Sequence, residues 1–336
     1  MAEAVPGGPA GSRTTRTGAC WVNGRLVGSG EGSVAALDHS IIVGDGVFET
    51  MKVIPGSTGG TPFALTRHLE RLRRSAEGLG IAPADDAVVR SAVAETLAAD
   101  PYAGRLRITW TSGTGPLGSG RGDGPGTLIV ATEETSVWPE SDRVHLCRWS
   151  RNEHGPLVGL KTTSYAENVL ALEEAHRRGC GEALFANTAG LLCEGTGTNV
   201  FLVVDGVLVT PPLSSGCLAG VTRELVLEIA PGTGLPVVER DVHPDEFSRA
   251  SEAFLTSSTR DVMAISGVDR GPSPESTGLD LPAAPGPVSS ALAAADPEFA
   301  GYVADTYATP IRVEIYEPTI PVPASPQVEL NFGYST

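Results

Sequence analysis

The stretch Val158-Gly-Leu-Lys161-Thr-Thr-Ser-Tyr165-Ala-Glu-Asn168 joins an apolar run to the beginning of a helical pattern. A lysine at such a boundary is usually a solvated side chain. A lysine that attacks a carbonyl group needs a neutral amine, and partial burial favours the neutral form. Lys161 stands at the end of the apolar run, where such burial is expected. The sequence therefore presents Lys161 as a candidate catalytic residue, beside the ordinary interpretation of a solvated lysine.

A second stretch, Leu192-Cys-Glu194-Gly-Thr-Gly-Thr-Asn199-Val-Phe201, places a carboxylate at the end of an apolar strand. An unpaired carboxylate in such a place is costly, so Glu194 needs a positively charged partner. That partner is either an arginine, in a buried ion pair, or the protonated ring nitrogen of a ligand. The residues by themselves leave both alternatives open.

A third stretch leads from a loop into a helix and reads Pro211-Pro-Leu-Ser-Ser-Gly-Cys-Leu-Ala-Gly220-Val-Thr-Arg223. The first turn of a helix offers free backbone N–H groups and the positive end of the helix dipole, and Thr222 adds a hydroxyl group. This arrangement suits an anion such as a phosphate. An ordinary helix cap has the same appearance, so the stretch alone is a weak signal.

The length of 336 residues fits two domains with a cleft between them, because a domain commonly holds roughly 100 to 200 residues. Turn signals and changes in composition predict four segments. These are a flexible N-terminus at 1–19, a small domain at 20–135, a large domain at 136–295 and a C-terminal extension of unknown role at 296–336.

Apolar periodicity predicts an α+β fold for both domains. In the small domain we expect a helix with its first turn at Arg67, with Thr66 as its N-cap and its end near Gly78 or Gly80. In the large domain we expect a helix around Tyr165 to His176 and another after Gly220. Alternating or continuous apolar runs predict strands at 47–53, 104–110, 127–132, 183–186, 191–193, 200–204 and 207–210.

The composition argues against several classes of partner. Forty acidic residues against 24 basic ones give a net charge of −16, which does not favour nucleic acid. Five cysteines without paired spacing favour free thiols over a zinc site, so we expect no metal. The N-terminus has no signal-like apolar region and no long apolar run occurs, so we expect a cytoplasmic protein that does not enter a membrane.

Five motifs in order resemble the class IV aminotransferases, the fold-type IV enzymes that use pyridoxal phosphate. The resemblance extends from about Cys20 to about Asp269 and implies the two-domain fold of D-amino acid aminotransferase, with the cofactor in the large domain and a homodimeric assembly. The motifs are Gly44-Asp-Gly-Val-Phe-Glu-Thr50, Arg67-His-Leu-Glu-Arg-Leu72, Lys161-Thr with Tyr165, Glu194-Gly-Thr-Gly-Thr-Asn199-Val, and Pro211-Pro with Gly220-Val-Thr-Arg223.

The resemblance also implies a role for each matching residue. Lys161 would form the aldimine with pyridoxal phosphate and move the proton at the carbon that bears the amine. Glu194 would face the ring nitrogen and keep it protonated, and Tyr165 would hydrogen-bond the ring hydroxyl oxygen. The phosphate would be held by Arg67, by Val221 and Thr222, and by Ser258, for which Ser257 or Thr259 could substitute.

The motifs look most like those of the aminodeoxychorismate lyases. The resemblance thus implies conversion of 4-amino-4-deoxychorismate to 4-aminobenzoate, a step of folate biosynthesis, with release of pyruvate. The alternative is an aminotransferase that acts on a branched-chain amino acid, a D-amino acid or another amine. A further alternative, from another class, is a non-catalytic protein that binds pyridoxal phosphate, against which the intact Lys161 and Glu194 argue.

Two positions bear on the choice of substrate. D-amino acid aminotransferases and some lyases have an arginine where this chain has Ser112. Arg107, on the preceding strand, matches an arginine of branched-chain enzymes and could bind a substrate carboxylate. An alternating strand could equally turn Arg107 toward solvent. We keep both interpretations of Arg107.

Overall fold

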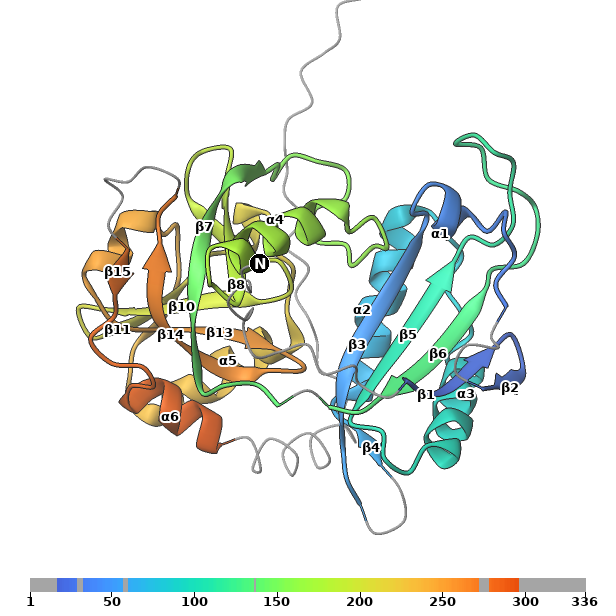
Figure 1. Ribbon diagram of the computed structural model, residues 1–336, viewed down its shortest axis with the longest axis horizontal. Coiled ribbons are helices and arrows are strands. Elements are labelled where there is room, and N and C mark those ends of the chain that lie inside the picture. The colour runs from blue at the N-terminus through green and yellow to red at the C-terminus, as the bar shows by residue number, and fades with distance from the viewer. Residues whose placement is uncertain (1–16, 29–32, 57–59, 136, 272–277, 296–336) are drawn as a thin grey trace, which may run out of the picture.

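A computed structural model describes residues 17–28, 33–56, 60–135, 137–271 and 278–295, which form two domains side by side (Figure 1). The chain leaves the first sheet at Glu133 and enters the second at Ser141. This arrangement confirms the predicted α+β fold with two domains. Part of the predicted flexible N-terminus is strand, because β1 already begins at Thr17. Residues 1–16 and the predicted extension 296–336 lie outside the described residues.

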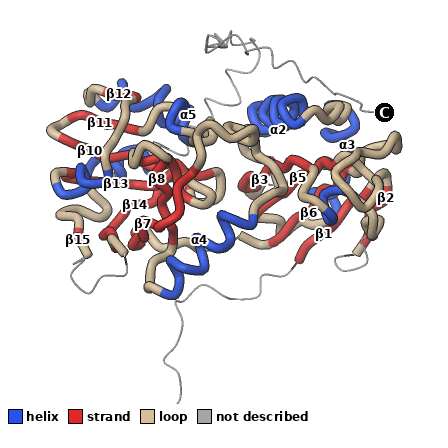
Figure 2. Tube along the Cα trace, turned by 90° about the horizontal axis from the view of Figure 1, so that it is seen from above, coloured by secondary structure: helices blue, strands red, loops and turns tan. Residues whose placement is uncertain are grey.

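The small domain is an antiparallel sheet of six strands in the order β2-β1-β6-β5-β3-β4, with two long helices on one face (Figure 2). The elements are β1 (Thr17–Val22), β2 (Arg25–Val27), α1 (His39–Ile42), β3 (Gly46–Ile54), β4 (Thr61–Pro62), α2 (Leu65–Leu79), α3 (Asp86–Ala99), β5 (Arg105–Thr111) and β6 (Leu128–Glu133).

Strand β3 connects this sheet to the rest of the molecule. Val47, Met51 and Val53 pack with apolar residues of α2 and α3 in the core of the small domain. Because side chains alternate between the faces of a strand, Phe48 and Thr50 project from the opposite face. That face looks toward the large domain, so β3 supplies residues both to the core and to the space between the domains.

Helix α2 begins earlier than predicted. Its N-cap is Ala64, in a left-handed conformation with φ of 51°, and no side chain caps the helix. The predicted cap, Thr66, is wrong because Thr66 lies inside the first turn, where its hydroxyl accepts a hydrogen bond from Arg90 at 3.3 Å. The end is as predicted, since Gly80 has φ of 73° and donates its N–H to the last turn.

The large domain is built on a mixed sheet of nine strands in the order β12-β11-β10-β13-β14-β7-β8-β9, with β15 paired to β14. Its elements are β7 (Ser141–Arg151), α4 (Ala166–Arg177), β8 (Glu182–Asn187), β9 (Leu192–Gly195), β10 (Asn199–Val204), β11 (Val207–Thr210), η1 (Leu213–Ser215), α5 (Val221–Ile229), η2 (Ala230–Thr233), β12 (Val237–Glu239), η3 (Pro244–Ser248), β13 (Ala250–Ser257), β14 (Asp261–Asp269), β15 (Leu279–Asp280) and α6 (Pro287–Ala294).

Strand β10 shows why this domain reads as continuous apolar runs in the sequence. Val200 and Leu202 point into one apolar core, while Phe201 and Val203 point into another, beside residues of α5 and α6. A strand buried on both faces has no polar side, so its sequence does not alternate. The strand and its neighbours thus form a fixed frame for the loops that carry the site.

Candidate active site

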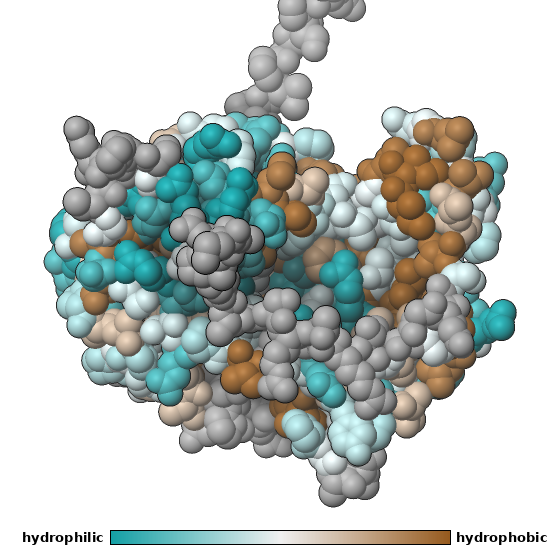
Figure 3. Space-filling view, in the orientation of Figure 1, coloured by the Kyte–Doolittle hydropathy of each residue, from teal (hydrophilic) through white to brown (hydrophobic). Residues whose placement is uncertain are grey.

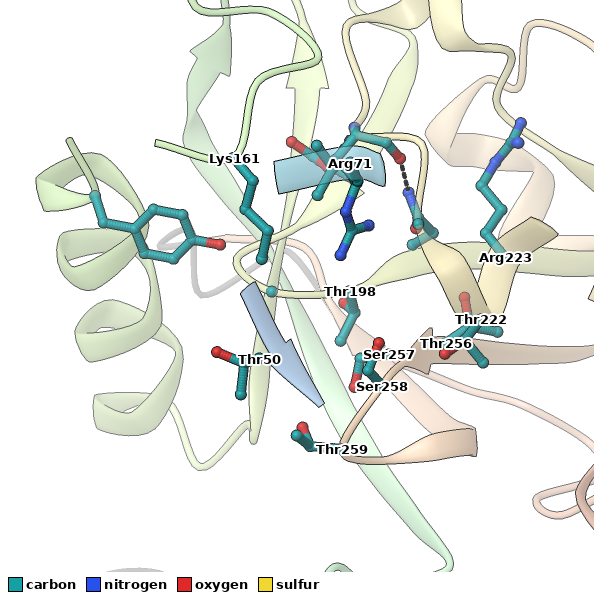
Figure 4. A pocket seen from close by; sticks show the side chains of 16 residues that line it. Thr50, Arg71, Lys161, Thr198, Thr222, Arg223, Thr256, Ser257, Ser258 and Thr259 are labelled. Atoms are coloured by element: carbon teal, nitrogen blue, oxygen red, sulfur yellow. Dashed lines mark hydrogen bonds between the residues drawn. The ribbon is translucent and has the colours of Figure 1, made fainter. Parts of the chain in front are cut away.

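A pocket lies between the domains, where β3 and α2 of the small domain meet several loops of the large domain (Figure 4). Five residues selected from the sequence therefore lie together: Lys161, Tyr165, Glu194, Thr222 and Ser258. The residues that line the pocket are Thr50, Arg71, Lys161, Tyr165, Glu194, Gly197, Thr198, Asn199, Leu218, Gly220, Thr222, Arg223, Thr256, Ser257, Ser258 and Thr259.

Lys161 is held by its backbone against the small domain. Its carbonyl accepts a hydrogen bond from the N–H of Phe48 at 3.0 Å, and its own N–H donates to the hydroxyl of Ser75 at 3.1 Å. The Nζ atom lies 4.5 Å from the centre of the Phe48 ring. Burial, and then the charge of Arg71, lower the pKa of the Lys161 ammonium from its ordinary 10.5 to about 8. A neutral amine is thus readily available.

Glu194 stands at the end of β9, where two groups fix its oxygens. The N–H of Leu218 donates to Oε2 at 2.9 Å, and Nε of Arg151 lies 3.6 Å from Oε1. Burial raises the pKa of the Glu194 carboxyl, although Arg151 opposes the rise. Both partners considered from the sequence are therefore compatible with the site, because Arg151 is present and Glu194 also faces the pocket.

Tyr165 precedes α4 and closes the side of the pocket next to Lys161. Its ring meets Phe48 edge to face, with centres 5.3 Å apart. Burial, and then the charge of Glu194, raise the pKa of the Tyr165 hydroxyl to about 12. The hydroxyl is therefore protonated at neutral pH.

The start of α5 leaves several hydrogen-bonding groups without partners. Gly220, the N-cap, provides no side chain to satisfy the first N–H groups of the helix. The Oγ1 atoms of Thr222 and Thr256 are buried, and neither has a hydrogen-bond partner among the described residues. Ser257 and Ser258 line the same end of the pocket. We call this group of residues the hydroxyl end of the pocket, and such a set of donors is suited to an anion.

The structure places Arg67 outside this pocket. Its Nη1 and Nη2 atoms donate to the carboxylate of Glu228 at 2.7 and 2.9 Å, which engages the guanidinium in an ion pair with α5. Arg71, one helical turn farther along α2, lines the pocket instead. The structure therefore does not support Arg67 as a residue that binds an anion in this pocket, and Arg71 takes its place among the residues that line it. Both arginines belong to one sequence motif, and only the packing of α2 against α5 distinguishes them.

Arg107 lies on the face of the small sheet that looks toward the pocket. It pairs with Thr50 across the ladder between β3 and β5, and its guanidinium carbon is 3.7 Å from the centre of the Phe48 ring. Its Nε donates to the hydroxyl of Thr109 at 3.2 Å, and no described carboxylate forms an ion pair with it. Arg107 is exposed, and its guanidinium and the Lys161 amine both lie against the Phe48 ring. Both interpretations of Arg107 stay predictions.

A wider cleft adjoins the pocket on the other side of Lys161. We call it the outer cleft; it is lined chiefly by 42–44 and 155–168 and shares Lys161, Tyr165 and Glu194 with the pocket. Several of its residues are apolar, among them Val43 and Leu157. A molecule that fills the outer cleft would thus reach the amine of Lys161 from outside.

Three further observations concern the cysteines, possible metal ligands and membrane-spanning helices. All five cysteines are free. Within the described ranges, no cluster of three or more histidine, cysteine, aspartate or glutamate side chains has the geometry to hold a metal ion. A search of the same ranges for a helix that is long and apolar enough to cross a membrane finds none.

Comparison with known proteins identifies the family. Residues 46–268 match amino-transferase class IV. A putative branched-chain-amino-acid aminotransferase of Methanocaldococcus jannaschii is 32% identical over 260 residues, which cover 74% of this chain and 87% of that protein. The branched-chain aminotransferase of Thermoproteus uzoniensis, solved with norvaline, has a TM-score of 0.77 at 30% identity, covering 87% of this chain and 97% of its own.

The solved structures that resemble this chain also include a lyase. The 4-amino-4-deoxychorismate lyase of Pseudomonas aeruginosa has a TM-score of 0.69 at 30% identity, covering 82% of this chain and 97% of its own. The two-domain α+β fold agrees with these likenesses. The chain therefore belongs to the class IV aminotransferases, enzymes that bind pyridoxal phosphate.

Proposed function

We propose that this enzyme is an aminotransferase that transfers the amino group of an amino acid to a 2-oxo acid. The observation that carries the proposal is the presence of Lys161 and Glu194 in one pocket, together with an arginine against Phe48, Arg107, that has no acidic partner among the described residues. The named relatives are mostly branched-chain aminotransferases, which favours this reaction over the lyase reaction that the motifs first suggested.

The hydroxyl end of the pocket fits the phosphate of pyridoxal phosphate. The buried Thr222 and Thr256 hydroxyls lack partners in the described part of the chain, and the oxygens of a phosphate would supply them. A Cβ atom on Gly220 would lie 2.0 Å from Oδ1 of Asn199, so the backbone here is closely packed. The phosphate would be held by Arg71, Thr222, Thr256, Ser257 and Ser258, together with the N–H groups at Val221 and Thr222.

The other end of the pocket fits the ring. Glu194 would face the ring nitrogen, since its oxygens are already oriented by Leu218 and Arg151. The hydroxyl of Tyr165 would hydrogen-bond the ring oxygen. When bound, pyridoxal phosphate supplies an aldehyde to hold the amino group and a ring that takes up the electrons released when a proton leaves.

Lys161 performs the proton transfers in this proposal. A group with a pKa of about 8 is neutral in about a tenth of the molecules at pH 7, whereas an ordinary lysine is neutral in less than about one in a thousand. The neutral amine would hold the cofactor through its aldehyde and, once displaced by the substrate amine, would accept the proton from the substrate carbon. The backbone hydrogen bonds to Phe48 and Ser75 keep the side chain in one place for both steps.

The substrate would enter through the outer cleft. Arg107 would bind a carboxylate, because its guanidinium forms no ion pair with a described residue and lies next to Phe48. Apolar residues of the outer cleft, such as Val43 and Leu157, would contact an aliphatic side chain. These features support an amino acid with an apolar side chain as the substrate.

The second candidate is the aminodeoxychorismate lyase. It is supported by the motifs of the chain and by the likeness to the lyase of Pseudomonas aeruginosa. In that reaction Lys161 would remove the same proton, after which pyruvate would leave as the substrate ring becomes aromatic. Binding of the cofactor does not distinguish the two reactions, since both require it.

A pair of assays on the purified enzyme tests the choice. We expect formation of a branched-chain 2-oxo acid when a branched-chain amino acid is supplied with 2-oxoglutarate. We expect no pyruvate above background from 4-amino-4-deoxychorismate. Release of pyruvate without any amino transfer would replace the proposal with the lyase. The absence of both products, in protein that carries the cofactor, would contradict both candidates.

We further propose that the enzyme works as a homodimer. Ile41, Val169 and Leu170 are each more than half exposed, and they lie close in sequence to residues of the outer cleft. Figure 3 shows apolar surface gathered on the upper part of the small domain. Sedimentation equilibrium should give twice the mass of one chain, and a monomer that is fully active would contradict this proposal. The cytoplasmic location stays a prediction.

A further inference from the structure

Arg71 is already engaged by the protein at one edge of its guanidinium. Nε donates to Oε1 of Glu49 at 2.8 Å, and Nη2 donates to Oε2 at 2.7 Å. Nη1 donates to the carbonyl of Ala219 at 2.9 Å, in the loop that leads into α5. A guanidinium has five N–H donors, so one remains on each terminal nitrogen. In Figure 4 the Arg71 side chain points into the pocket that Lys161 also enters.

Glu49 is a buried carboxylate on the core side of β3. It is fully inaccessible to solvent, and Nδ1 of His68 lies 2.6 Å from its Oε2. Burial alone would raise the pKa of Glu49, but the ion pair with Arg71 holds that pKa at about 2. Burial lowers the pKa of the His68 imidazole, so the neutral ring donates its N–H to the carboxylate. The three side chains form one hydrogen-bonded chain.

We propose that Glu49 is a positioning residue for the phosphate of pyridoxal phosphate, acting through Arg71. Supported by His68, it holds the guanidinium so that the two free donors face the hydroxyl end of the pocket. This inference rests on the proposed function, which assigns the phosphate to Arg71. It adds that buried residues of the small domain orient the arginine that binds the phosphate.

The charges around Arg71 show why the orientation of its guanidinium determines the affinity for a phosphate. Glu49 partly neutralises the arginine, so its removal could in principle strengthen the attraction for a phosphate. However, the charge of Glu224, in the first turn of α5, also acts on Arg71. Without Glu49 the guanidinium would lose its two-point support and would remain subject to Glu224. A free arginine side chain also has to be ordered when the phosphate binds, which costs conformational entropy.

The same helix offers a matched comparison. Arg67 and Glu228 form a second two-point ion pair one turn earlier on α2, with distances of 2.7 and 2.9 Å. Unlike Glu49, the side chain of Glu228 is 33% exposed, and neither partner lines the pocket. The substitution Glu228→Gln therefore removes the same kind of interaction without touching the phosphate site.

The test compares the affinity of the enzyme for two ligands. Holoenzyme is freed of cofactor, and the dissociation constants of pyridoxal phosphate and of pyridoxal, which lacks the phosphate, are measured by fluorescence. In Glu49→Gln, pyridoxal phosphate should bind about tenfold more weakly, as expected for a misaligned charge-assisted hydrogen bond, while pyridoxal changes by less than about twofold. The ratio that is compared between variants is the dissociation constant of pyridoxal divided by that of pyridoxal phosphate, and Glu228→Gln should leave this ratio unchanged.

Equal weakening of both ligands in Glu49→Gln, or tighter binding of pyridoxal phosphate, would overturn the inference. Arg71→Lys separates this failure from that of the proposed function, because it keeps the charge but loses the paired donors. An unchanged ratio in Arg71→Lys would remove Arg71 from the phosphate site altogether. A lowered ratio in Arg71→Lys without one in Glu49→Gln would refute only the inference about Glu49.

A second variant covers the case in which Glu49→Gln does not fold. His68→Phe keeps a ring in the buried position and removes only the hydrogen bond to Glu49. The ratio should fall by a smaller factor, about threefold, because the ion pair between Glu49 and Arg71 remains. An unchanged ratio in folded His68→Phe enzyme would contradict the role of His68 behind Glu49.

Discussion

The two ends of the pocket are constructed in opposite ways. At the hydroxyl end, no described residue hydrogen-bonds the buried Thr222 and Thr256 hydroxyls or provides a side-chain cap for the helix start at Gly220. At the other end, Glu194 already has the N–H of Leu218 on one oxygen and Arg151 near the other. The first end is completed by its ligand, whereas the second is organised before the ligand arrives.

This difference predicts that one end of the pocket determines the affinity for the cofactor and the other end determines the rate of the reaction. Groups that gain partners only when a ligand binds contribute mainly to how tightly it is held. A carboxylate fixed in advance can act on charge that develops during the reaction, without first being reoriented. Substitutions at the hydroxyl end should therefore change cofactor affinity, and substitutions at Glu194 should change the turnover of enzyme that is saturated with cofactor.

The largest effect is expected at Lys161, which stands between the two ends. Lys161→Ala should lower kcat at least about a thousandfold, because it removes the residue that we propose to form the covalent link and move the proton. The chain contains only one other lysine, Lys52, which pairs with Asp261 at 2.8 Å. Lys52→Arg is thus the control and should retain turnover. Peptide mass mapping after borohydride reduction should find the cofactor on Lys161, and its recovery on Lys52 would refute the assignment.

The next largest effect is expected at Glu194. Glu194→Gln should lower kcat about a hundredfold, because an amide cannot keep the ring nitrogen protonated. Cofactor affinity should change by less than about threefold, since the phosphate contacts remain. Steady-state kinetics at saturating cofactor, together with a cofactor titration, measure both quantities. If Glu194→Gln mainly weakened cofactor binding and left kcat nearly unchanged, Glu194 would belong functionally with the hydroxyl end, and the proposed difference between the two ends would be wrong.

A smaller effect is expected at the hydroxyl end. Thr222→Val should weaken the binding of pyridoxal phosphate about tenfold and leave kcat of the saturated enzyme within about twofold of the original. Thr96→Val is the matched control. Its hydroxyl is also buried, but it donates to the carbonyl of Ala92 in α3, far from the pocket. If kcat of Thr222→Val enzyme saturated with cofactor fell as much as its affinity for pyridoxal phosphate, the hydroxyl end would contribute directly to the reaction.

The last prediction concerns pH, and its effect is about as large as that of Thr222→Val. The amine of Lys161 must lose its proton before it can join an aldehyde, so the rate of cofactor capture should rise with pH and level off above about pH 8. Between that plateau and pH 7 the rate should fall about tenfold. Stopped-flow absorbance on cofactor-free enzyme measures the rate. A rate that continues to rise up to the ordinary lysine pKa of 10.5 would show that burial does not activate this amine.

Much of the site could be predicted because its residues lie in short contiguous motifs. The polar or ionisable residues Lys161, Glu194 and Thr222 each stand where an apolar run meets a loop, and that local contrast is visible in the sequence. The structure places these residues in one pocket, and their individual roles stay proposals. The α+β fold followed from the same periodicity, since buried strands and amphipathic helices leave different patterns.

The rest of the site depends on contacts between segments that are far apart in the sequence, and a local sequence pattern does not reveal such contacts. Arg67 and Arg71 lie four residues apart on one helical face, so periodicity could not show which of them meets the loop at Ala219. Glu49 follows Phe48 in a recognisable motif, yet its function depends on α2 crossing β3. The hydrogen bond from Lys161 to Ser75 joins residues 86 positions apart. Such long-range contacts become visible only once the two domains are placed together.

The way the Lys161 peptide is bound has a consequence for biosynthesis. One of its hydrogen bonds goes to β3 and the other to α2, and both elements precede Lys161 in the chain. They leave the ribosome first, so the nascent segment that carries the reactive amine meets a template that is already folded. A large domain made as a separate fragment would lack both of these hydrogen bonds.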